Sequence, residues 1–167
     1  MGVKVKTITN KFPAMEKALR IVDGKKISVG VMGENAWIAS IHEYGCRIRI
    51  TDKMRAWLHR NGLHVKDTTT EIVIPERSFL RSGYDACRDK VLDRADRALE
   101  ILLDGVWDED DFYKFVGEFL RDNIQDYAED LAAPAKHPFT LERNGGLTDL
   151  FVGKNGGFIN DIEYEVE

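Results

Sequence analysis

The chain has 167 residues, of which 43% are hydrophobic and 32% are charged, with a formal net charge of −5. This length and composition suit a single α+β domain with a real apolar core, spanning residues 1–167. No apolar run approaches the roughly 20 residues that cross a bilayer, and the N-terminus lacks the apolar centre of a signal peptide, so we expect no membrane partner.

Short elements are predicted over the first third of the chain. Residues 3–9, VKVKTIT, alternate strictly and predict a strand. Asn10 is a suitable cap for a helix that follows, and residues 25–33, KKISVGVMG, predict a second strand. The apolar residues that this first helix carries on one side are Phe12, Met15, Leu19 and Val22.

Residues 34–45, ENAWIASIHEYG, predict a short helix that Gly45 ends. His42 and Glu43 fall beside its apolar stripe. The stripe, which we expect to face the core, consists of Trp37, Ile38, Ile41 and Tyr44.

The next segment alternates again and then becomes helical. CRIRIT, residues 46–51, predicts a strand with its isoleucines inward and its arginines outward. Residues 51–62 predict a capped helix, and residues 68–75 predict a strand closed by a proline. The core-facing residues expected on that helix are Met54, Trp57 and Leu58.

Two long helices are predicted next. The first begins at Ser78, a suitable cap, and ends at Gly105, and the second starts after the acidic run at residues 108–111. Together they predict a helical hairpin. Residues 132–160 are predicted to be loop-rich and mobile, and residues 158–167 to form a closing strand. The fold class is therefore α+β, with a small, mostly antiparallel sheet packed against a helical hairpin and short helices.

Residues with catalytic or metal-binding chemistry are scattered. His42 and Glu43 are adjacent, so on a helix they point about 100° apart. The remaining histidines and the two cysteines, Cys46 and Cys87, show no zinc-ligand spacing, and the thiols are expected to be reduced. The glycine-rich residues 144–157 do not match a phosphate-binding loop. We therefore expect no enzyme activity and no cofactor.

The charged residues are unevenly distributed along the chain, and basic residues cluster between positions 47 and 60. Residues 1–99 carry 19 Lys and Arg against 12 Asp and Glu, whereas residues 100–130 carry 2 against 11. One interpretation is an acidic helix beside a mildly basic sheet; another is a subunit whose unlike faces dock on its own copies. The basic residues between 47 and 60 also raise the hypothesis of a cytosolic nucleic-acid-binding module. They are Arg47, Arg49, Lys53, Arg55 and Arg60.

IPERSFLRSGYD, residues 74–85, joins a strand to the first long helix. Arg77 and Arg81 flank the apolar pair Phe79 and Leu80, and guanidinium groups bind carboxylates in a forked geometry. One interpretation is a plain joint with the apolar pair in the core. The other adds an intersubunit contact made by these four residues.

Two motifs together resemble a known family. IASIHEYG at residues 38–45, followed by the 74–85 segment, resembles the tail-completion and neck proteins of long-tailed bacteriophages, a minor-tail group that includes Mu-like members. Those proteins have a short helix ending in His-Glu-Tyr/Phe-Gly and then an Ile-Pro-x-Arg-x-Phe-Leu-Arg motif opening a long helix. The C-terminus fits partly, because the family's Thr-Gly is replaced by Leu150-Phe151 and a longer glycine loop.

The resemblance implies a structural virion protein, made in the host cytoplasm, that joins tail to head. It implies a homo-oligomeric ring, expected to be a hexamer, in contact with other neck, connector and tail proteins; a tail terminator is the alternative. It also implies interface candidates and residues that would face DNA in the channel, here Lys53, Arg55 and Arg60. The interface candidates are Arg47, Arg49, Arg77, Phe79, Leu80, Arg81, Asp108, Glu109, Asp110 and Asp111.

Overall fold

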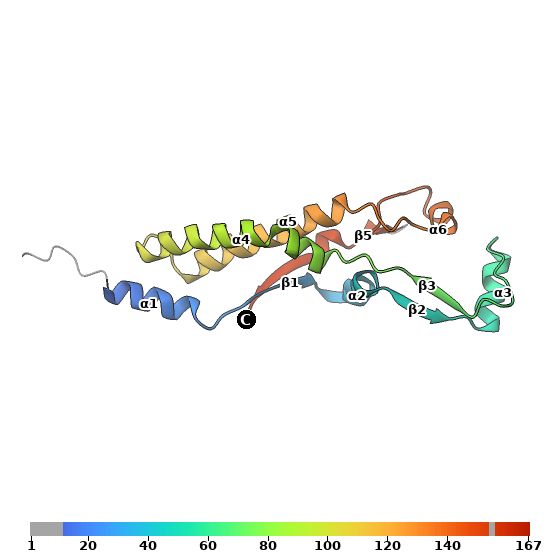
Figure 1. Cartoon of the computed structure of the whole chain (residues 1–167), viewed down its shortest axis with the longest axis horizontal. Helices are drawn as coiled ribbons and strands as arrows, with labels where there is room; N and C mark the ends of the chain where they lie inside the picture. Colours follow the sequence, from blue (N-terminus) through green and yellow to red (C-terminus); the bar gives the residue numbers. More distant parts are fainter. Residues whose placement is uncertain (1–11, 154–155) are drawn as a thin grey trace, which may run out of the picture.

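The computed structural model describes residues 12–153 and 156–167 and shows an elongated α+β molecule (Figure 1). Its body is a helical hairpin of α4 (Leu80–Leu103) and α5 (Glu109–Asp130), as the sequence predicts. The α5 helix begins with a reciprocal cap, in which Asp108 accepts from the Asp111 amide and Asp111 accepts from the Asp108 amide. The buried residues of α4 recur at helical spacing and face α5. They are Gly83, Cys87, Val91, Ala98 and Leu102.

The closing strand pairs as predicted. β6 (Ile162–Val166) runs antiparallel to β1 (Ile27–Val31), with Val29 opposite Tyr164. The Tyr164 ring lies against Gly117 of α5, where a Cβ atom would overlap the ring. A glycine in mid-helix therefore lets this two-stranded ladder approach the helical hairpin closely.

A second ladder, together with a helix, forms the arm, which we define as residues 46–74. β2 (Cys46–Arg49) pairs antiparallel with β3 (Glu71–Ile74), and α3 (Asp52–Arg60) lies at its tip (Figure 1). The expected alternation is confirmed, because Ile48 is partly buried whereas the neighbouring arginines are exposed. The strands nevertheless form separate two-stranded ladders instead of the single small sheet predicted from the sequence.

Residues 132–160 contain more structure than the sequence predicts. They include α6 (Pro138–Arg143) and the short pair of strands β4 (Val152–Gly153) and β5 (Gly156–Gly157). A 3-10 turn, Ile159–Asp161, then leads into β6, and a second one, Gly33–Asn35, follows β1. The side chains of Leu150, Phe151 and Phe158 are buried in the core, so this segment is anchored. The sequence did not predict this structure because the apolar residues here are spaced irregularly between glycines and form no periodic pattern.

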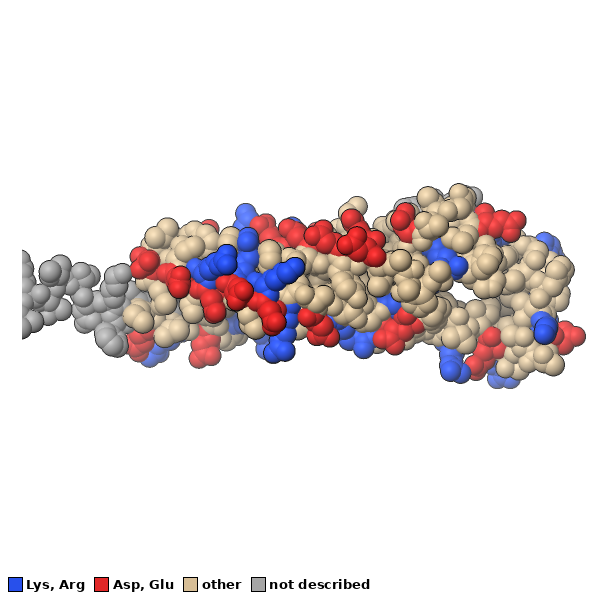
Figure 2. Space-filling model, turned by 45° about the horizontal axis from the view of Figure 1, so that its top comes forward, with Lys and Arg blue, Asp and Glu red and all other residues tan. Residues whose placement is uncertain are grey.

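At its far end, α6 touches the tip of the arm. Arg143 Nη1 donates to Asn61 Oδ1 at 2.9 Å, and the guanidinium lies over the Trp57 ring. Figure 2 shows an opening through the molecule near this end, between two masses of side chains. The arm is thus held at its base by α2 and at its tip by α6.

The helix α1 (Phe12–Val22) extends from the other end of the molecule (Figure 1). Two residues of its apolar stripe, Met15 and Leu19, are exposed. The strand predicted at residues 3–9 and the cap predicted at Asn10 lie outside the described residues. Among the described residues, no helix is long and apolar enough to cross a membrane.

The surface charge is more mixed than the sequence segments indicate. Figure 2 shows acidic and basic side chains interleaved over the helical hairpin, because α4 contributes many of the basic residues counted in the first 99 positions. The arm keeps an excess of basic residues, with six Lys and Arg against three Asp and Glu. The prediction of an acidic helix beside a basic sheet is therefore too simple.

Candidate functional site

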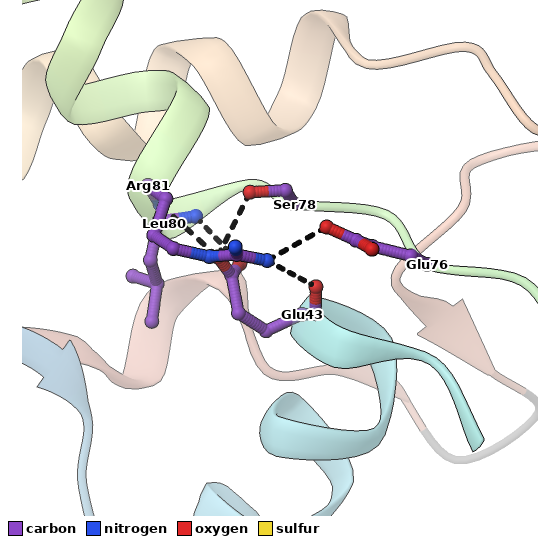
Figure 3. Close-up of polar contacts among 5 residues, drawn as sticks. All are labelled: Glu43, Glu76, Ser78, Leu80 and Arg81. Atoms are coloured by element: carbon purple, nitrogen blue, oxygen red, sulfur yellow. Dashed lines mark hydrogen bonds and ion pairs between the residues drawn. The ribbon is translucent and has the colours of Figure 1, made fainter.

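The two sequence motifs meet at one joint, between the end of α2 (Ala36–Tyr44) and the start of α4. Glu43 is its centre. Its side chain is 2% exposed, and its oxygens accept hydrogen bonds from the Leu80 amide at 2.9 Å, the Arg81 amide at 3.2 Å and Ser78 Oγ at 2.9 Å (Figure 3). Arg81 Nε also donates to it at 2.8 Å.

Glu43 therefore caps α4 although it lies 37 residues before Leu80 in the sequence. A helix N-terminus leaves amides without partners and carries partial positive charge, which a carboxylate satisfies. Ser78 was expected to cap α4, and this prediction is wrong, since its hydroxyl donates to Glu43 and no local side chain caps the helix. Burial on its own raises the pKa of Glu43, but the donors from Leu80, Arg81 and Ser78 outweigh it and lower the pKa.

Arg81 extends the joint to the surface. Its Nη2 donates to Glu76 Oε1 at 2.7 Å and to the Glu43 backbone carbonyl at 3.2 Å. The guanidinium also lies over the Tyr44 ring, 4.7 Å from its centroid. One arginine thus connects the buried carboxylate, an exposed carboxylate and an exposed aromatic ring.

His42 and Arg77 form the inner part of the joint. The Arg77 amide donates to the His42 carbonyl at 2.7 Å, and Arg77 Nη1 lies 3.4 Å from His42 Nδ1. Arg77 Nε donates to the Pro134 carbonyl at 2.8 Å, which ties the joint to the segment after α5. Burial lowers the pKa of His42 to about 4, with further lowering by the charges of Arg77 and Lys136.

Gly45 lets the two motifs touch. Its φ is +68°, and a Cβ atom there would lie 2.8 Å from both the Glu76 amide nitrogen and the Ile74 carbonyl oxygen. Backbone is in the way, so a larger residue would displace β3 from α2. Each residue from 42 to 45 therefore contacts the 74–81 segment.

Two of the proposed interface anchors lie inside the subunit. Phe79 is fully buried, with its ring centroid 4.9 Å from that of Phe151, and Arg77 is buried at the joint. Neither offers a surface to another chain, so their prediction as intersubunit contacts is wrong. Leu80 is partly buried, while the Arg81 side chain is about half exposed and stays available.

Only part of the predicted stripe of α2 faces the core, because Ile38 packs against it whereas Trp37 and Tyr44 point outward. The buried residues of this helix are Ala39 and Glu43, whereas Trp37 is 66% exposed and Tyr44 is 64% exposed. The reason is the cap on α4, because turning Glu43 inward turns the aromatic side outward. A similar correction holds for Trp57 of α3, which is exposed while Leu58 is buried.

The basic candidates on the arm fall into two groups. Arg55 is partly buried and donates to the carbonyls of Lys66 at 2.6 Å and Thr69 at 2.7 Å, so its guanidinium is engaged within the arm. The others are exposed, and Arg47 lies 3.5 Å from Glu71 within the ladder. The exposed members are Arg47, Arg49, Lys53 and Arg60.

The acidic candidates at the start of α5 are engaged locally. Asp108 and Asp111 form the reciprocal cap, and Glu109 pairs with Lys25. No ion pair between these acids and the arm is present in the described parts of the chain. The structure therefore keeps the two oppositely charged groups apart within one subunit, and Asp110 remains exposed.

The joint is a closed polar network. Over residues 12–153 and 156–167, every buried side-chain nitrogen or oxygen has a hydrogen-bond partner, and no cluster of three or more His, Cys, Asp or Glu has metal-binding geometry. The geometry of the joint fixes the direction of the arm relative to the helical hairpin. Sequence reasoning missed the roles of Glu43 and Glu76, although an acid inside an apolar helix pattern was a usable signal.

No family model, curated protein or solved structure matches this chain.

Proposed function

We propose that this protein is a structural subunit of the head–tail junction of a long-tailed bacteriophage, a neck or tail-completion ring protein that joins tail to head. The observation that carries the proposal is the joint. The two motifs on which the family resemblance rests, residues 42–45 and 74–81, contact each other residue by residue.

The architecture also supports a structural role, in which the arm binds neighbouring proteins. The joint sets the angle of an arm that projects from the helical hairpin, and the arm carries exposed basic residues. A projecting two-stranded ladder has little stability in isolation, and further contacts would stabilise it. Neighbouring subunits in a ring, or adjoining neck and tail proteins, would supply such contacts.

The test is a gene knock-out in the producing phage, followed by electron microscopy of the lysate. We expect filled heads and separate tails of normal length, with infectivity restored by the gene supplied in trans. Overlong tails would favour the tail-terminator alternative instead. Intact infectious particles from the knock-out would contradict both.

A nucleic-acid-binding module is a second candidate, favoured by the exposed side chains of Arg49, Lys53 and Arg60 on the arm. This function requires salt-dependent DNA or RNA binding that weakens when the three are changed to alanine. A gel shift at low salt measures it. Arg55→Ala is unsuitable as a probe, because Arg55 holds the turn that follows α3.

A further inference from the structure

The β1–β6 ladder has two strands in the described parts of the chain, so β6 lies at an edge. Lys26 and Glu167 exchange both of their backbone hydrogen bonds, at 2.8 and 2.9 Å. Hydrogen-bonded pairs alternate along an antiparallel ladder, so the backbone groups of Tyr164 and Val166 point away from β1. The Ile162 carbonyl accepts from Gln125 Nε2 at 3.0 Å, which leaves residues 163–166 as the edge that a further strand can pair with.

This edge is acidic on one face. Tyr164 points toward α5, where its ring lies against Gly117, so the exposed side chains of Glu163 and Glu165 lie on the opposite face of the ladder. Arg121 Nη1 lies 3.9 Å from Glu163, at the limit of an ion pair, and Glu165 has no ion-pair partner among the described residues. Antiparallel pairing of two β6 strands would put glutamates opposite each other, which is unfavourable. The edge therefore favours a strand that carries alternating basic residues.

On its other face, the edge borders a groove. The groove has a volume of about 420 Å³ and lies between β6 and the first turns of α5. Apolar and aromatic surface is available there, because Val166 is 39% exposed and the Tyr164 side chain is partly exposed. A strand added to the edge would therefore direct every second side chain toward this groove, and apolar side chains suit those positions. The lining residues are Lys25, Asp110, Tyr113, Lys114, Tyr164 and Val166.

The start of the chain has a sequence that meets both requirements. Residues 3–6, which lie outside the described residues, read VKVK. When this sequence is paired antiparallel to β6, with Lys4 opposite Glu165, each lysine meets a glutamate and each valine meets a residue beside the groove. The pairs are Val3–Val166, Lys4–Glu165, Val5–Tyr164 and Lys6–Glu163.

The same subunit cannot supply this strand while α1 keeps its position. The register puts Lys6 beside Glu163, and the six residues from Lys6 to Phe12 span at most about 21 Å of extended chain. Phe12 starts α1 at the end of the helix that lies farthest from β6 (Figure 1). The separation along β6 from Glu163 and then along the 11 residues of α1 is about 30 Å. The strand must therefore come from another copy.

We propose that residues 3–6 of one copy of this chain pair as an antiparallel strand with the free edge of β6 in a second copy. The inference goes beyond the proposed function, because it concerns self-association in any assembly that contains this chain. The strand and the edge are different surfaces, so the contact is heterologous. Its repetition gives a ring when the rotation closes and a filament when it does not.

Mixed disulfide formation tests the register directly. Lys4→Cys and Glu165→Cys would lie opposite each other at one of the closely spaced pairs of the new ladder, within reach of a disulfide. Both variants carry Cys46→Ala, since Cys46 is partly exposed, while Cys87 is buried and stays. Under mild oxidation with copper–phenanthroline, we expect cross-linked dimers only when the two variants are mixed. Asp93→Cys, exposed on α4, replaces Glu165→Cys in the control mixture, which should form none.

Other cross-linking patterns overturn the inference. Dimers of Lys4→Cys alone, or of Glu165→Cys alone, would show that two identical segments pair. A chain with both cysteines that closes into a cross-linked monomer would show that its own residues 3–6 reach the edge. Absence of a mixed dimer at the highest soluble concentration would show that this strand does not bind there.

Charge reversal provides a second measurement, by sedimentation equilibrium. We expect Lys4→Glu with Lys6→Glu to weaken self-association at least about 10-fold, because two attractive pairs become two repulsive ones. Glu163→Lys with Glu165→Lys should cause a similar loss. A chain with all four reversals should regain an affinity close to that of the wild type, since each pair is again of unlike charge.

Asp93→Lys with Glu100→Lys is the matched control, because it makes the same change in net charge at exposed positions on α4. It should keep the wild-type affinity. An equal loss in this control, no recovery in the fourfold variant, or a wild-type chain that stays monomeric would overturn the inference. Any of these results beside a knock-out with unjoined heads and tails would overturn this contact alone and leave the proposed function standing.

Discussion

Glu43 is a carboxylate with four donors directed at it and almost no contact with solvent. Such a group is stable only while its partners stay in place, because an unpaired buried charge is costly. Two of its partners are amides at the start of α4, so this side chain links the stability of two helices.

We expect Glu43→Gln to lower the free energy of unfolding by about 3 kcal/mol, because the amide loses the charge and directs an NH₂ group at donors. Urea denaturation measures the loss. Glu76→Gln is the matched control: Glu76 also accepts from Arg81 but is exposed, and we expect a loss below about 1 kcal/mol. Similar losses for both would contradict the capping role of Glu43.

His42 makes stability depend on pH. Its folded pKa of about 4 lies below the ordinary 6.5, so the unfolded chain binds more protons between these values. Stability therefore falls as the solution is acidified, by about 2 kcal/mol between pH 7 and pH 5 from this group. We expect His42→Phe to remove that part of the slope in denaturation curves.

His64→Phe is the control for this measurement, since His64 is exposed on the arm. It should keep the wild-type slope between pH 7 and pH 5. An unchanged slope in His42→Phe would show that the ring is protonated as readily in the folded protein as in the unfolded chain.

At the scale of elements, most helices and strands follow from their sequence patterns. The hairpin of α4 and α5 has long apolar stripes, and the alternation in β2 and β6 fixes which residues face inward. The orientation of α2 could not be predicted in this way. Hydrophobicity favours an inward Trp37, but the unsatisfied amides of α4 select Glu43 instead, and this requirement comes from a distant segment.

The joint, too, was predictable where it depends on neighbouring residues and unpredictable where it depends on residues far apart in the sequence. The sequence placed Phe79 and Leu80 at a strand-to-helix turn, and that interpretation is confirmed. Local patterns could not show that Ser78 would donate to Glu43 instead of capping α4. The α6 helix was missed because its six residues are too few for a periodic pattern.

The arm depends on Arg55, whose guanidinium holds the carbonyls of Lys66 and Thr69. We expect Arg55→Lys to lose this forked contact and raise amide hydrogen exchange across residues 63–70 at least 10-fold, with little change in the helical hairpin. Hydrogen exchange read by mass spectrometry gives both values.

Lys53→Ala, at an exposed position on the same helix, should leave that exchange pattern unchanged. Faster exchange in the hairpin of the Arg55 variant would mean that arm and body unfold as one unit.

At the scale of the whole molecule, the arm and the α6 segment enclose an opening (Figure 2), and Arg143 joins their ends. An exposed contact of this kind contributes less than about 1 kcal/mol. We expect Arg143→Ala to leave the melting temperature unchanged but to broaden the distance between spin labels placed on α3 and α6. Glu142→Ala, exposed on the same helix, should keep the narrow distribution.

The distant cap on α4 also bears on the order of folding. The first turn of α4 has no local side-chain acceptor, so we expect it to become stable only when the chain between Glu43 and Leu80 closes. The central turns, which pack on α5, need no such closure. We therefore expect nucleation at the hairpin, followed by late consolidation of the α4 start together with the base of the arm.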